Sequence, residues 1–393
     1  ASSSLTVTID SPAYLQNSYN FSDTTNNNAY EGETNPNPPT AGQPPLTGTP
    51  ADSSDYAKLI LNDGSRWQSS ATTDTYYVYQ TFSFTISQPA ADIRSVTFTY
   101  DGYFTSHTTL TADDFKIYVY NYNTNSYNSL VNVTGQTSDI TIAANLPTSF
   151  SQYINSTTNK MSFLAIGDFA LNGPQPGNLR ADANTDYVSL SIEAYPVLSG
   201  NYPINVTAVD ADGIAQCRYF IRNSTYSYAY VDMTEISLFK YYNISNTQIY
   251  ADGFYNLTAN CTDSLGQVND TTYITVKVSN IAPSLILLGP LNASNFTTTN
   301  NITFSWNATS SLGGKTICSL YLDGAINQTN IIALSGANTS RNITSIVDGT
   351  HTWKVTCSQT GGAFNTSETR TIYVDLNKPT ITLNTPTPSQ YFS

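Results

Sequence analysis

The chain has 393 residues and a formal net charge of −13, and only 11% of its residues are charged. Phosphate binding needs clustered Lys and Arg, and the sequence has no basic run, so the composition argues against nucleic acid as a partner. No stretch of about 20 apolar residues occurs, so the sequence predicts no membrane-spanning helix.

The composition is typical of an all-β protein with wet outer faces. Tyr is unusually frequent, at 29 residues, while Lys and Arg together number only 15. β-branched and aromatic side chains pack well on a pleated sheet, whereas the long cations that favour helices are scarce here. The sequence begins ASSSLTV, without an initiator Met, which is compatible with a mature chain whose signal peptide has been removed. We therefore expect an extracellular location at the cell surface.

Residues 1–195 contain no Cys and predict one jelly-roll-like β domain. About eight strands in a domain of this size are typical of a two-sheet jelly roll. A Pro- and Asn-rich segment from about Asn26 to Pro50 is too polar to pack by itself. The strand-like stretches are, in chain order, Leu5–Ile9, Tyr76–Ile86, Val96–Tyr100, Phe115–Tyr120, Ile140–Ile142, Met161–Ile166 and Tyr187–Ile192.

A stripe of tyrosines marks one face of this domain. Phe115, Ile117 and Val119 point one way along their strand, so the other face is expected to carry Tyr118, Tyr120 and Tyr122, joined by Tyr77 and Tyr79. The stripe has three interpretations, which the sequence leaves open. The first is that the tyrosines stack on sugar rings, and the second is that they pack against a neighbouring subunit. The third is that they lie under the Pro-rich segment.

The following residues repeat a unit of about 90 residues, which predicts two Ig-like β-sandwiches, at 196–281 and 282–376. Each copy contains a strand that begins near a Cys, an Asp-Gly turn and an alternating strand that ends in a second Cys. The matching stretches are QCRYFIR and DGFYNLTANCTDSLG in the first copy, and ICSLYLDG and DGTHTWKVTCSQTGG in the second. Because apolar and polar residues alternate, one face of each strand is expected to be buried.

The four cysteines predict one disulfide in each Ig-like domain. Cys217 and Cys261 lie in the first copy, and Cys318 and Cys357 lie in the second. The absence of close pairs such as C-x-x-C argues against zinc. In a secreted protein such a pattern indicates disulfides, and we expect each bridge to join the neighbouring third and sixth strands.

The last segment, 377–393, reads as an extended tail or as the first strand of a further Ig-like domain. The stretch Pro283-Ser-Leu-Ile-Leu-Leu-Gly-Pro290 matches Pro379-Thr-Ile-Thr-Leu-Asn-Thr-Pro386. A strand without a domain of its own can complete a sheet in a neighbouring molecule, where main-chain hydrogen bonds supply the affinity. The candidates for such donation are two segments, represented by Leu5, Val7 and Ile9 at the start and by Ile381 and Leu383 at the end.

Asn-x-Ser/Thr sequons are the clearest chemical signal in the sequence. Because 14 of the 17 lie after residue 196, the second half is enriched, and we expect N-linked glycans on several of them. Asn205, Asn256 and Asn260 alternate with buried residues and are expected to face solvent. The alternative is a wet sandwich face that is simply rich in Asn and Thr. The seventeen acceptors are Asn20, Asn132, Asn155, Asn205, Asn223, Asn243, Asn256, Asn260, Asn269, Asn292, Asn295, Asn301, Asn307, Asn327, Asn338, Asn342 and Asn365.

Catalytic and metal-binding signals are weak. The only histidines, His107 and His351, are expected to be ordinary surface residues, so we predict no catalytic residues and no enzyme activity. Asp210-Ala-Asp212-Gly213 resembles half of a calcium loop, but a turn between strands explains it equally well. We predict no cofactor apart from the glycans, and leave calcium open at Asp210 and Asp212.

The stretches NITFSWNAT, CSLYLDG, DGTHTWKVTC and TIYVDLNKPTI resemble Ig-like repeats of large archaeal cell-surface proteins. The resemblance covers about residues 196–393. The first domain is similar to jelly-roll modules of secreted prokaryotic proteins, through VTFTYDGY, YVYNYNTNSY and ADANTDYVSLSIEA. The resemblance implies S-layers, pilus-like threads or adhesive coats.

The sequence therefore predicts a glycosylated structural subunit of an archaeal surface filament or S-layer-like lattice, a homo-oligomer assembled by β-strand addition between copies. The alternative is an adhesin or carbohydrate-binding module of a larger surface protein, with glycans as its partner.

Overall fold

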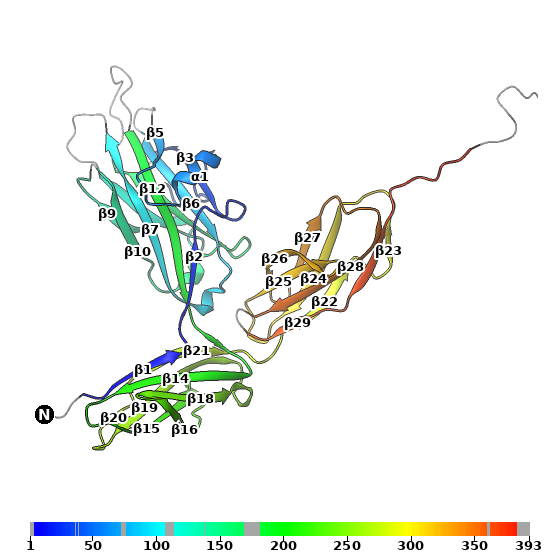
Figure 1. Cartoon of the computed structure of the whole chain (residues 1–393). Helices are drawn as coiled ribbons and strands as arrows, with labels where there is room; N and C mark the ends of the chain where they lie inside the picture. The colour runs from blue at the N-terminus through cyan, green and yellow to red at the C-terminus, as the bar shows by residue number, and fades with distance from the viewer. Residues whose placement is uncertain are drawn as a thin grey trace, which may run out of the picture. The chain divides into compact units, whose positions relative to one another are not determined.

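The computed structural model describes residues 4–35, 37, 39–71, 76–106, 114–136, 138–168, 181–359 and 362–382. Nearly all the regular structure in these ranges is β-strand, arranged in six sheets (Figure 1). The predicted all-β fold class is confirmed. The chain divides into two compact units. One holds Ala1–Val197, Asn201–Ser245 and Phe254–Lys277, and the other holds Leu198–Gly200, Asn246–Gly253 and Val278–Ser393.

Residues 15–194 form a jelly-roll domain of two sheets. Four strands of each sheet follow the double Greek-key order of a jelly roll. The first sheet consists of β10 (Ile140–Asn145), β7 (Ile93–Ser106), β12 (Ala181–Ala194) and β2 (Leu15–Tyr19), with β5 (Trp67–Ala71) paired to β12. The second consists of β4 (Thr49–Pro50), β3 (Asn28–Thr34), β6 (Tyr77–Thr85), β11 (Lys160–Gly167), β8 (Phe115–Asn121) and β9 (Ser126–Val133).

Aromatic rings fill the space between these two sheets. Phe82, Phe84, Phe98 and Phe163 are all fully buried in one apolar cluster. The rings of Phe98 and Phe163 stack with their centroids 4.2 Å apart, which joins the two sheets through β7 and β11. The alternation that predicted these strands therefore reflects burial of one face of each sheet against the other.

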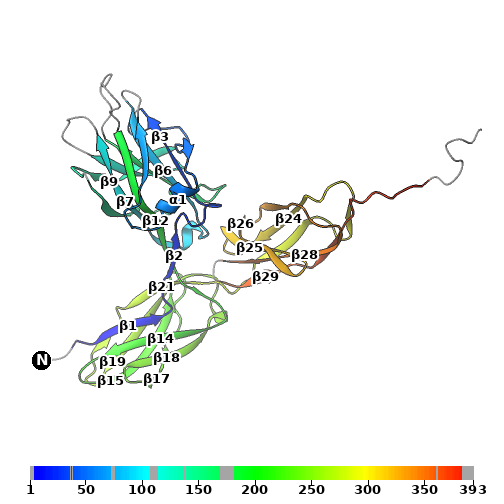
Figure 2. The same ribbon diagram turned by 45° about the horizontal axis from the view of Figure 1, so that its top comes forward.

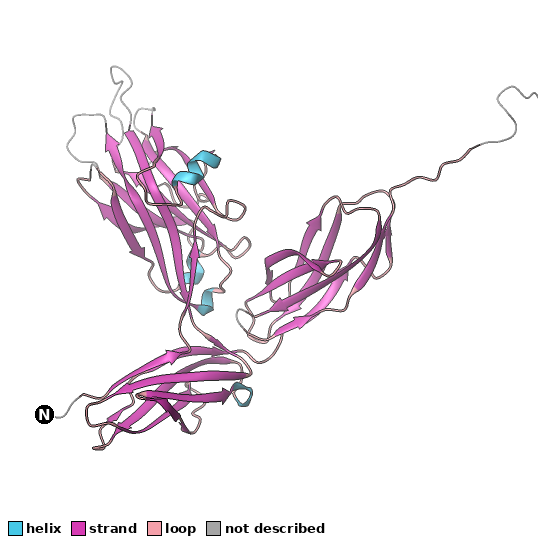
Figure 3. Cartoon of the chain, in the orientation of Figure 1, coloured by secondary structure: helices cyan, strands magenta, loops and turns pink. Residues whose placement is uncertain are grey.

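Helices are short in the described ranges (Figure 3). They are α1 (Ser53–Lys58) and the single turns η1 (Ala90–Asp92), η2 (Phe150–Tyr153) and η3 (Thr247–Ile249). Asp52 caps α1 by accepting hydrogen bonds from the backbone N–H groups of Ser54 and Asp55. None of these helices has the length and apolarity needed to cross a bilayer.

The first Ig-like domain also consists of two sheets. One contains β1 (Thr6–Ser11), β14 (Asn201–Val209), β18 (Lys240–Asn246) and β17 (Thr234–Ser237). The other contains β13 (Val197–Leu198), β21 (Tyr273–Val278), β19 (Gly253–Asp263), β15 (Ile214–Arg222) and β16 (Val231–Asp232), with β20 (Val268–Asn269) paired to β19.

The position of β1 corrects the predicted domain boundaries. The sequence placed Leu5–Ile9 in a first domain of residues 1–195, but β1 pairs antiparallel with β14 of the Ig-like domain, as Figures 1 and 2 both show. The jelly roll is therefore inserted between the first strand of this Ig-like domain and the rest of it. The error arose because strand pairing between residues far apart in sequence leaves no local signal.

The second Ig-like domain has the same plan without an insertion. One sheet contains β22 (Ser284–Gly289), β24 (Ile302–Thr309) and β27 (Asn338–Ile343). The other contains β23 (Ser294–Phe296), β30 (Arg370–Val374), β28 (Gly349–Ser358), β25 (Lys315–Leu322) and β26 (Ala325–Leu334), with β29 (Phe364–Thr366) paired to β28. Its core is built around the buried rings of Trp306 and Trp353 and the half-cystines Cys318 and Cys357.

Both predicted disulfides are present. Cys217 of β15 lies opposite Cys261 of β19, and Cys318 of β25 lies opposite Cys357 of β28. Each bridge therefore joins neighbouring strands of one sheet, as the sequence predicted. All four cysteines are fully buried, so each disulfide is part of its domain's core.

Candidate functional site

The first feature with functional potential is the groove that holds β1. Val7 is buried, opposite Ala208 of β14, and Ile9 lies half-buried opposite Val206. Two side chains also bind the backbone of this strand. Asn269 Nδ2 donates to the carbonyl of Leu5 at 3.1 Å, and Thr272 Oγ1 donates to the carbonyl of Val7 at 3.1 Å. The groove thus recognises β1 mainly through its backbone, together with two apolar side chains.

The second Ig-like domain holds its own first strand in the same register. Leu285 of β22 lies opposite Ala308, Leu287 lies opposite Trp306, and the register shifts before Gly289. In the first domain the register shifts in the same way between Ile9 and Ser11. The two first strands are therefore equivalent, and each is followed by a proline.

The tail repeats the sequence of β1 more closely than it repeats β22. Thr6-Val-Thr-Ile-Asp-Ser-Pro12 corresponds to Thr380-Ile-Thr-Leu-Asn-Thr-Pro386. The two Thr residues and the Pro are identical, and every other pair is a conservative exchange. Ile381, at the position of Val7, is 88% exposed, and residues 375–382 contain no strand. Leu383, the other predicted donor residue of the tail, lies outside the described residues.

The tyrosine stripe lies under the Pro-rich segment, which was one of its three predicted interpretations. Residues 39–47, here called the strap, cover Tyr79, Tyr118 and Tyr120, each no more than 5% exposed. Tyr79 Oη donates to the carbonyl of Thr47 at 2.9 Å, and Tyr127 Oη accepts the N–H of Leu46 at 2.8 Å. Burial raises the pKa of Tyr79 and of Tyr127. This stripe is therefore internal packing of the jelly roll.

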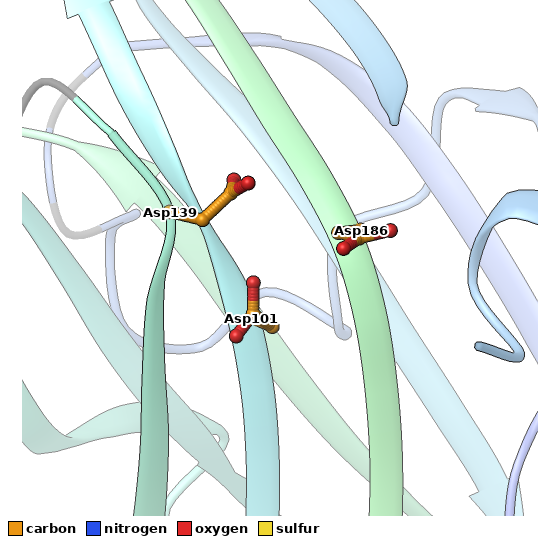
Figure 4. Close-up of side chains that lie close together, drawn as sticks. All are labelled: Asp101, Asp139 and Asp186. Carbon is orange, nitrogen blue, oxygen red and sulfur yellow. The ribbon is translucent and has the colours of Figure 1, made fainter. Parts of the chain in front are cut away.

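A second feature is a cluster of three carboxylates at one end of the jelly roll's first sheet, here called the acidic cluster (Figure 4). Asp101 lies on β7, Asp139 directly precedes β10, and Asp186 lies on β12. In β12 the register shifts between Thr185 and Tyr187, so Asp186 is the additional residue of a β-bulge.

Gly102 allows the close approach that brings β7 to this bulge. A Cβ atom at Gly102 would lie 2.3 Å from the carbonyl oxygen of Asn184. No larger residue fits there without a shift of the backbone, so the Asp-Gly pair on β7 is needed for the geometry of the bulge. This places the carboxylates of Asp101 and Asp186 on neighbouring strands and side by side.

The three carboxylates approach one another closely. One oxygen from each residue lies within 4.8 Å of the other two. Asp101 and Asp186 are only 2% and 1% exposed, and Asp139 is half-buried. The sequence analysis did not find this cluster, because its members come from three strands and share no local spacing.

The loop at residues 62–66 supplies most of the hydrogen bonds to the acidic cluster. Asp186 accepts the backbone N–H of Gly64 at 2.9 Å and that of Asp63 at 3.4 Å. Arg66 Nε donates to both oxygens of Asp139, at 3.0 and 3.1 Å, and this pairing raises the pKa of Arg66.

Asp101 is only partly satisfied by its neighbours. Its Oδ2 accepts Asn62 Nδ2 at 3.0 Å and the hydroxyl of Thr141. Its Oδ1 is buried and has no hydrogen-bond partner among the residues that the structure describes. One oxygen of Asp101 points toward the space between Asp139 and Asp186 (Figure 4).

The predicted metal candidates Asp210 and Asp212 form a turn between β14 and β15. Asp210 Oδ1 accepts the backbone N–H of Asp212 at 2.9 Å. No third acidic, His or Cys side chain joins them in a metal-binding group within the described ranges. The geometry therefore fits the turn that the sequence analysis offered as the alternative to calcium.

His351 is not a surface residue, contrary to the prediction. It is 7% exposed, with Nδ1 2.7 Å from Asp323 Oδ2 and Nε2 2.8 Å from the carbonyl oxygen of Val347. Burial opposes its charged form, but the hydrogen bonds to Asp323 and Val347 outweigh that effect and raise the pKa of His351. The prediction placed His351 in an exposed hairpin, whereas it lies on β28 in phase with the buried Trp353 and Val355. His107 lies outside the described residues.

The sequon asparagines are at least partly exposed, with one exception. Asn260 is 5% exposed, although the alternation of β19 predicted that it faces solvent. It lies on a central strand, and Arg218 of the neighbouring strand donates to its Oδ1 at 3.2 Å while lying over the ring of Tyr230. Long side chains from the flanking strand thus cover the outer face at this position. Of the two other asparagines predicted to face solvent, Asn205 and Asn256, both are half-buried.

Taken together, the topology and the two disulfides define an all-β protein of Ig-like domains that is compatible with an extracellular location. Residues 24–194 match the family AF_1625_C, whose description is "Uncharacterized protein, C-terminal domain". The matched range lies within the inserted jelly roll, and this part of the chain is similar to that family. No curated protein matches the chain.

Solved structures that resemble the chain are chiefly fibronectin-III-like and Ig-like. The fibronectin(III)-like modules of Clostridium thermocellum CbhA are 16% identical, with 48% of this chain and 96% of that chain covered and a TM-score of 0.32. The chicken CNTN1 FN1–FN3 domains are 9% identical, covering 78% and 97%, with a TM-score of 0.28. The BSP domain of a biofilm associated protein is 11% identical, covering 82% and 69%, with a TM-score of 0.18. Likenesses this distant carry no argument about what the chain does.

Proposed function

We propose that the chain is a structural subunit of an extracellular filament or lattice, in which copies are joined by exchange of a first strand. The tail of one copy takes the place of β1 beside β14 of the next copy. The observation that supports this most directly is the repeat of Thr6–Pro12 at Thr380–Pro386. A groove that accepts the first sequence presents the same backbone groups and apolar pockets to the second.

The exchange is nearly balanced in energy. Ile381 replaces Val7 with one additional methylene, and Leu383 replaces Ile9 with an isomer of equal size. One methylene contributes about 0.8 kcal/mol when it is buried, and volume-conserving exchanges cost little. The backbone ladder to β14 is the same in both cases, so the tail competes with β1 for one groove.

Such an exchange is a head-to-tail contact. The donating tail and the accepting groove are different surfaces, so each copy can donate to one neighbour and accept from another. Heterologous contacts of this kind build open assemblies rather than closed dimers. N-linked glycans on the Ig-like domains, where most sequons lie, are expected to coat the outer faces of such an assembly and to limit lateral aggregation of strand edges.

The adhesin alternative depended on a surface for ligand binding. The tyrosine stripe supplied that surface in its sugar-binding interpretation, but the strap covers Tyr79, Tyr118 and Tyr120. An adhesin or carbohydrate-binding module would need another face, and no other observation favours one. Strand exchange is therefore the function we adopt.

The experiment uses a variant that lacks residues 1–12, which frees the groove beside β14, and a labelled peptide of residues 378–387. We expect the peptide to bind this variant much more tightly than it binds the intact chain, in which β1 competes for the same groove. An Ile381→Asp peptide is expected to bind about 10- to 100-fold more weakly, because an apolar side chain worth about 1.5–3 kcal/mol is lost. A Thr382→Asp peptide is the matched control, since the equivalent Thr8 is exposed.

The intact chain supplies the second readout. Electron microscopy and light scattering of the full chain are expected to show assemblies that Ile381→Asp abolishes and Thr382→Asp preserves. Equal binding of all three peptides would refute recognition in the predicted register. Single particles of the full chain, with peptide binding retained, would instead assign the tail to the first strand of a further Ig-like domain.

A further inference from the structure

The acidic cluster is a second site and shares no residue with the groove that holds β1. A buried carboxylate oxygen without a partner loses its hydration and gains nothing in return, which costs free energy. Asp101 Oδ1 is such an atom, in a residue only 2% exposed. One oxygen of Asp101 points toward the space between Asp139 and Asp186 (Figure 4), and one oxygen of each residue lies within 4.8 Å of the other two. A positive charge in the space that the three oxygens share would compensate this arrangement.

The protein supplies only part of that charge. Arg66 donates to both oxygens of Asp139. The backbone N–H groups of Asp63 and Gly64 donate to Asp186, and Asn62 and Thr141 donate to Asp101 Oδ2. Three carboxylates and one guanidinium leave two negative charges, which one divalent cation would neutralise.

The donor atoms select the type of cation. All three side-chain ligands are carboxylate oxygens, and no His or Cys takes part in this group. Hard, oxygen-preferring ions fit such a set, whereas zinc favours nitrogen and sulfur. Calcium binds oxygens at 2.3–2.6 Å, so two ligands of one ion can lie as far as about 5 Å apart. The three carboxylate oxygens of the acidic cluster lie within 4.8 Å of one another, which agrees with that range. Magnesium demands a tighter octahedron than three side chains from separate strands are expected to provide.

We propose that Asp101, Asp139 and Asp186 bind one calcium ion. Asp101 provides a ligand from β7, Asp186 provides one from the bulge of β12, and Asp139 provides one from the position directly before β10. The ion would tie together three neighbouring strands of one sheet and, through Asp186, the loop at residues 62–66. This site is distinct from the turn at Asp210 and Asp212 that the sequence left open for calcium.

The test measures binding of calcium chloride to the full chain after treatment with a chelator, by isothermal titration calorimetry. We expect one site per chain that half-saturates at about 0.1–1 mM, the range of extracellular calcium modules. Terbium supplies an independent readout, since Tyr103 lies 5.5 Å from the Arg66 guanidinium and can sensitise a lanthanide bound nearby. Calcium is expected to displace terbium, and magnesium to do so at least tenfold less effectively.

Two variants locate the site, and a third is the matched control. Asp101→Asn and Asp139→Asn are each expected to weaken calcium binding at least tenfold. Asp139 is half-buried, so its variant keeps the test valid if Asp101→Asn fails to fold. Asp182→Asn is the control, because Asp182 is a buried carboxylate of the same strand β12 that hydrogen-bonds Ser70 and Gln68 instead. The Asp182→Asn variant should bind calcium with the same affinity as the unmodified chain.

Absence of calcium binding to the unmodified chain up to 10 mM would overturn the proposal. Binding that is equal in the unmodified chain, Asp101→Asn and Asp139→Asn would overturn it as well, since the ion would then lie elsewhere. Neither result bears on the peptide experiment, because the groove beside β14 contains none of these residues.

Discussion

The most buried ion pair among the described residues makes a quantitative prediction possible. Lys277 of β21 places Nζ 2.8 Å from both oxygens of Asp92, which lies on η1 of the jelly roll. Their side chains are 7% and 3% exposed. The pair joins the inserted domain to the Ig-like domain that hosts it. We predict that Lys277→Met, which removes the charge and retains most of the apolar stem, strongly destabilises the chain.

The free-energy cost of Lys277→Met follows from the burial of the pair. Burial raises the pKa of Asp92 even though the Lys277 ammonium opposes that rise. Desolvation of the carboxylate is therefore only partly offset in the native chain. Removing one member of a buried pair typically costs about 3–5 kcal/mol, because the remaining charge is left without compensation. In a domain of this size the expected loss is roughly 10 °C in the midpoint of the affected transition.

The pH dependence distinguishes this mechanism from lost packing. A carboxyl group whose pKa is raised in the folded state stabilises the fold when protonated, and this contribution is lost as the pH rises through the folded pKa. The cost of Lys277→Met should therefore be large at pH 7 and much smaller near pH 4. The double variant Lys277→Met with Asp92→Leu should recover most of the stability at pH 7, since no buried charge remains.

Differential scanning calorimetry at pH 4 and pH 7 measures both quantities. The control is Lys240→Met, because Lys240 pairs with Asp10 at 3.2 Å but the two side chains are 49% and 34% exposed. Exposed pairs contribute no more than about 1 kcal/mol, so this variant should shift the midpoint by no more than a few degrees. A Lys277→Met cost below about 1 kcal/mol at pH 7, or an equal cost at both pH values, would refute the reasoning.

Three further predictions concern the Ig-like domains. Reduction of the two disulfides, which close loops of 44 and 39 residues, should cost about 3–4 kcal/mol each, measured as a lower urea midpoint in reductant. Because the pKa of His351 is raised in the folded state, its contribution to stability is full below the unfolded pKa of about 6.5 and is lost as the pH rises through the folded pKa. Wild type should therefore lose stability from pH 6 to 8, while His351→Gln does not. Peptide mass spectrometry of native material should find Asn342 glycosylated and Asn260 unmodified, and a glycan at Asn260 would contradict its burial.

Much of the fold could be predicted because its signals are local. Alternation of apolar and polar residues predicted the strands. Cysteines on the inward faces of two strands in each Ig-like domain predicted both disulfides. In DGTHTWKVTC, Trp353, Val355 and Cys357 alternate in the sequence and are all buried in the structure. The same alternation misled at Asn260, because periodicity reports which face a residue occupies and not whether neighbouring side chains cover that face.

Features that depend on distant pairing escaped prediction. From sequence alone, β1 is assigned to the domain that follows it in the chain. Only its pairing with β14 shows that it belongs to the Ig-like domain. The similarity between Thr6–Pro12 and Thr380–Pro386 was the signal that could have revealed this. The acidic cluster offered no such signal, because Asp101, Asp139 and Asp186 meet only through sheet pairing and a bulge.

The insertion is physically tolerable because the jelly roll begins and ends at one place. Leu15 of β2 lies directly opposite Ala194 of β12, so entry to and exit from the inserted domain are neighbours. While the jelly roll is folded, β1 is tethered to β14 by only the short segments 12–14 and 195–200. If it unfolds, the tether becomes a coil from residue 12 to residue 200, and closing that longer loop costs about 3 kcal/mol more. The fold of the jelly roll therefore sets how strongly β1 competes for its own groove. It follows that whatever stabilises the jelly roll, including an ion at the acidic cluster, favours β1 over the tail of a neighbouring copy.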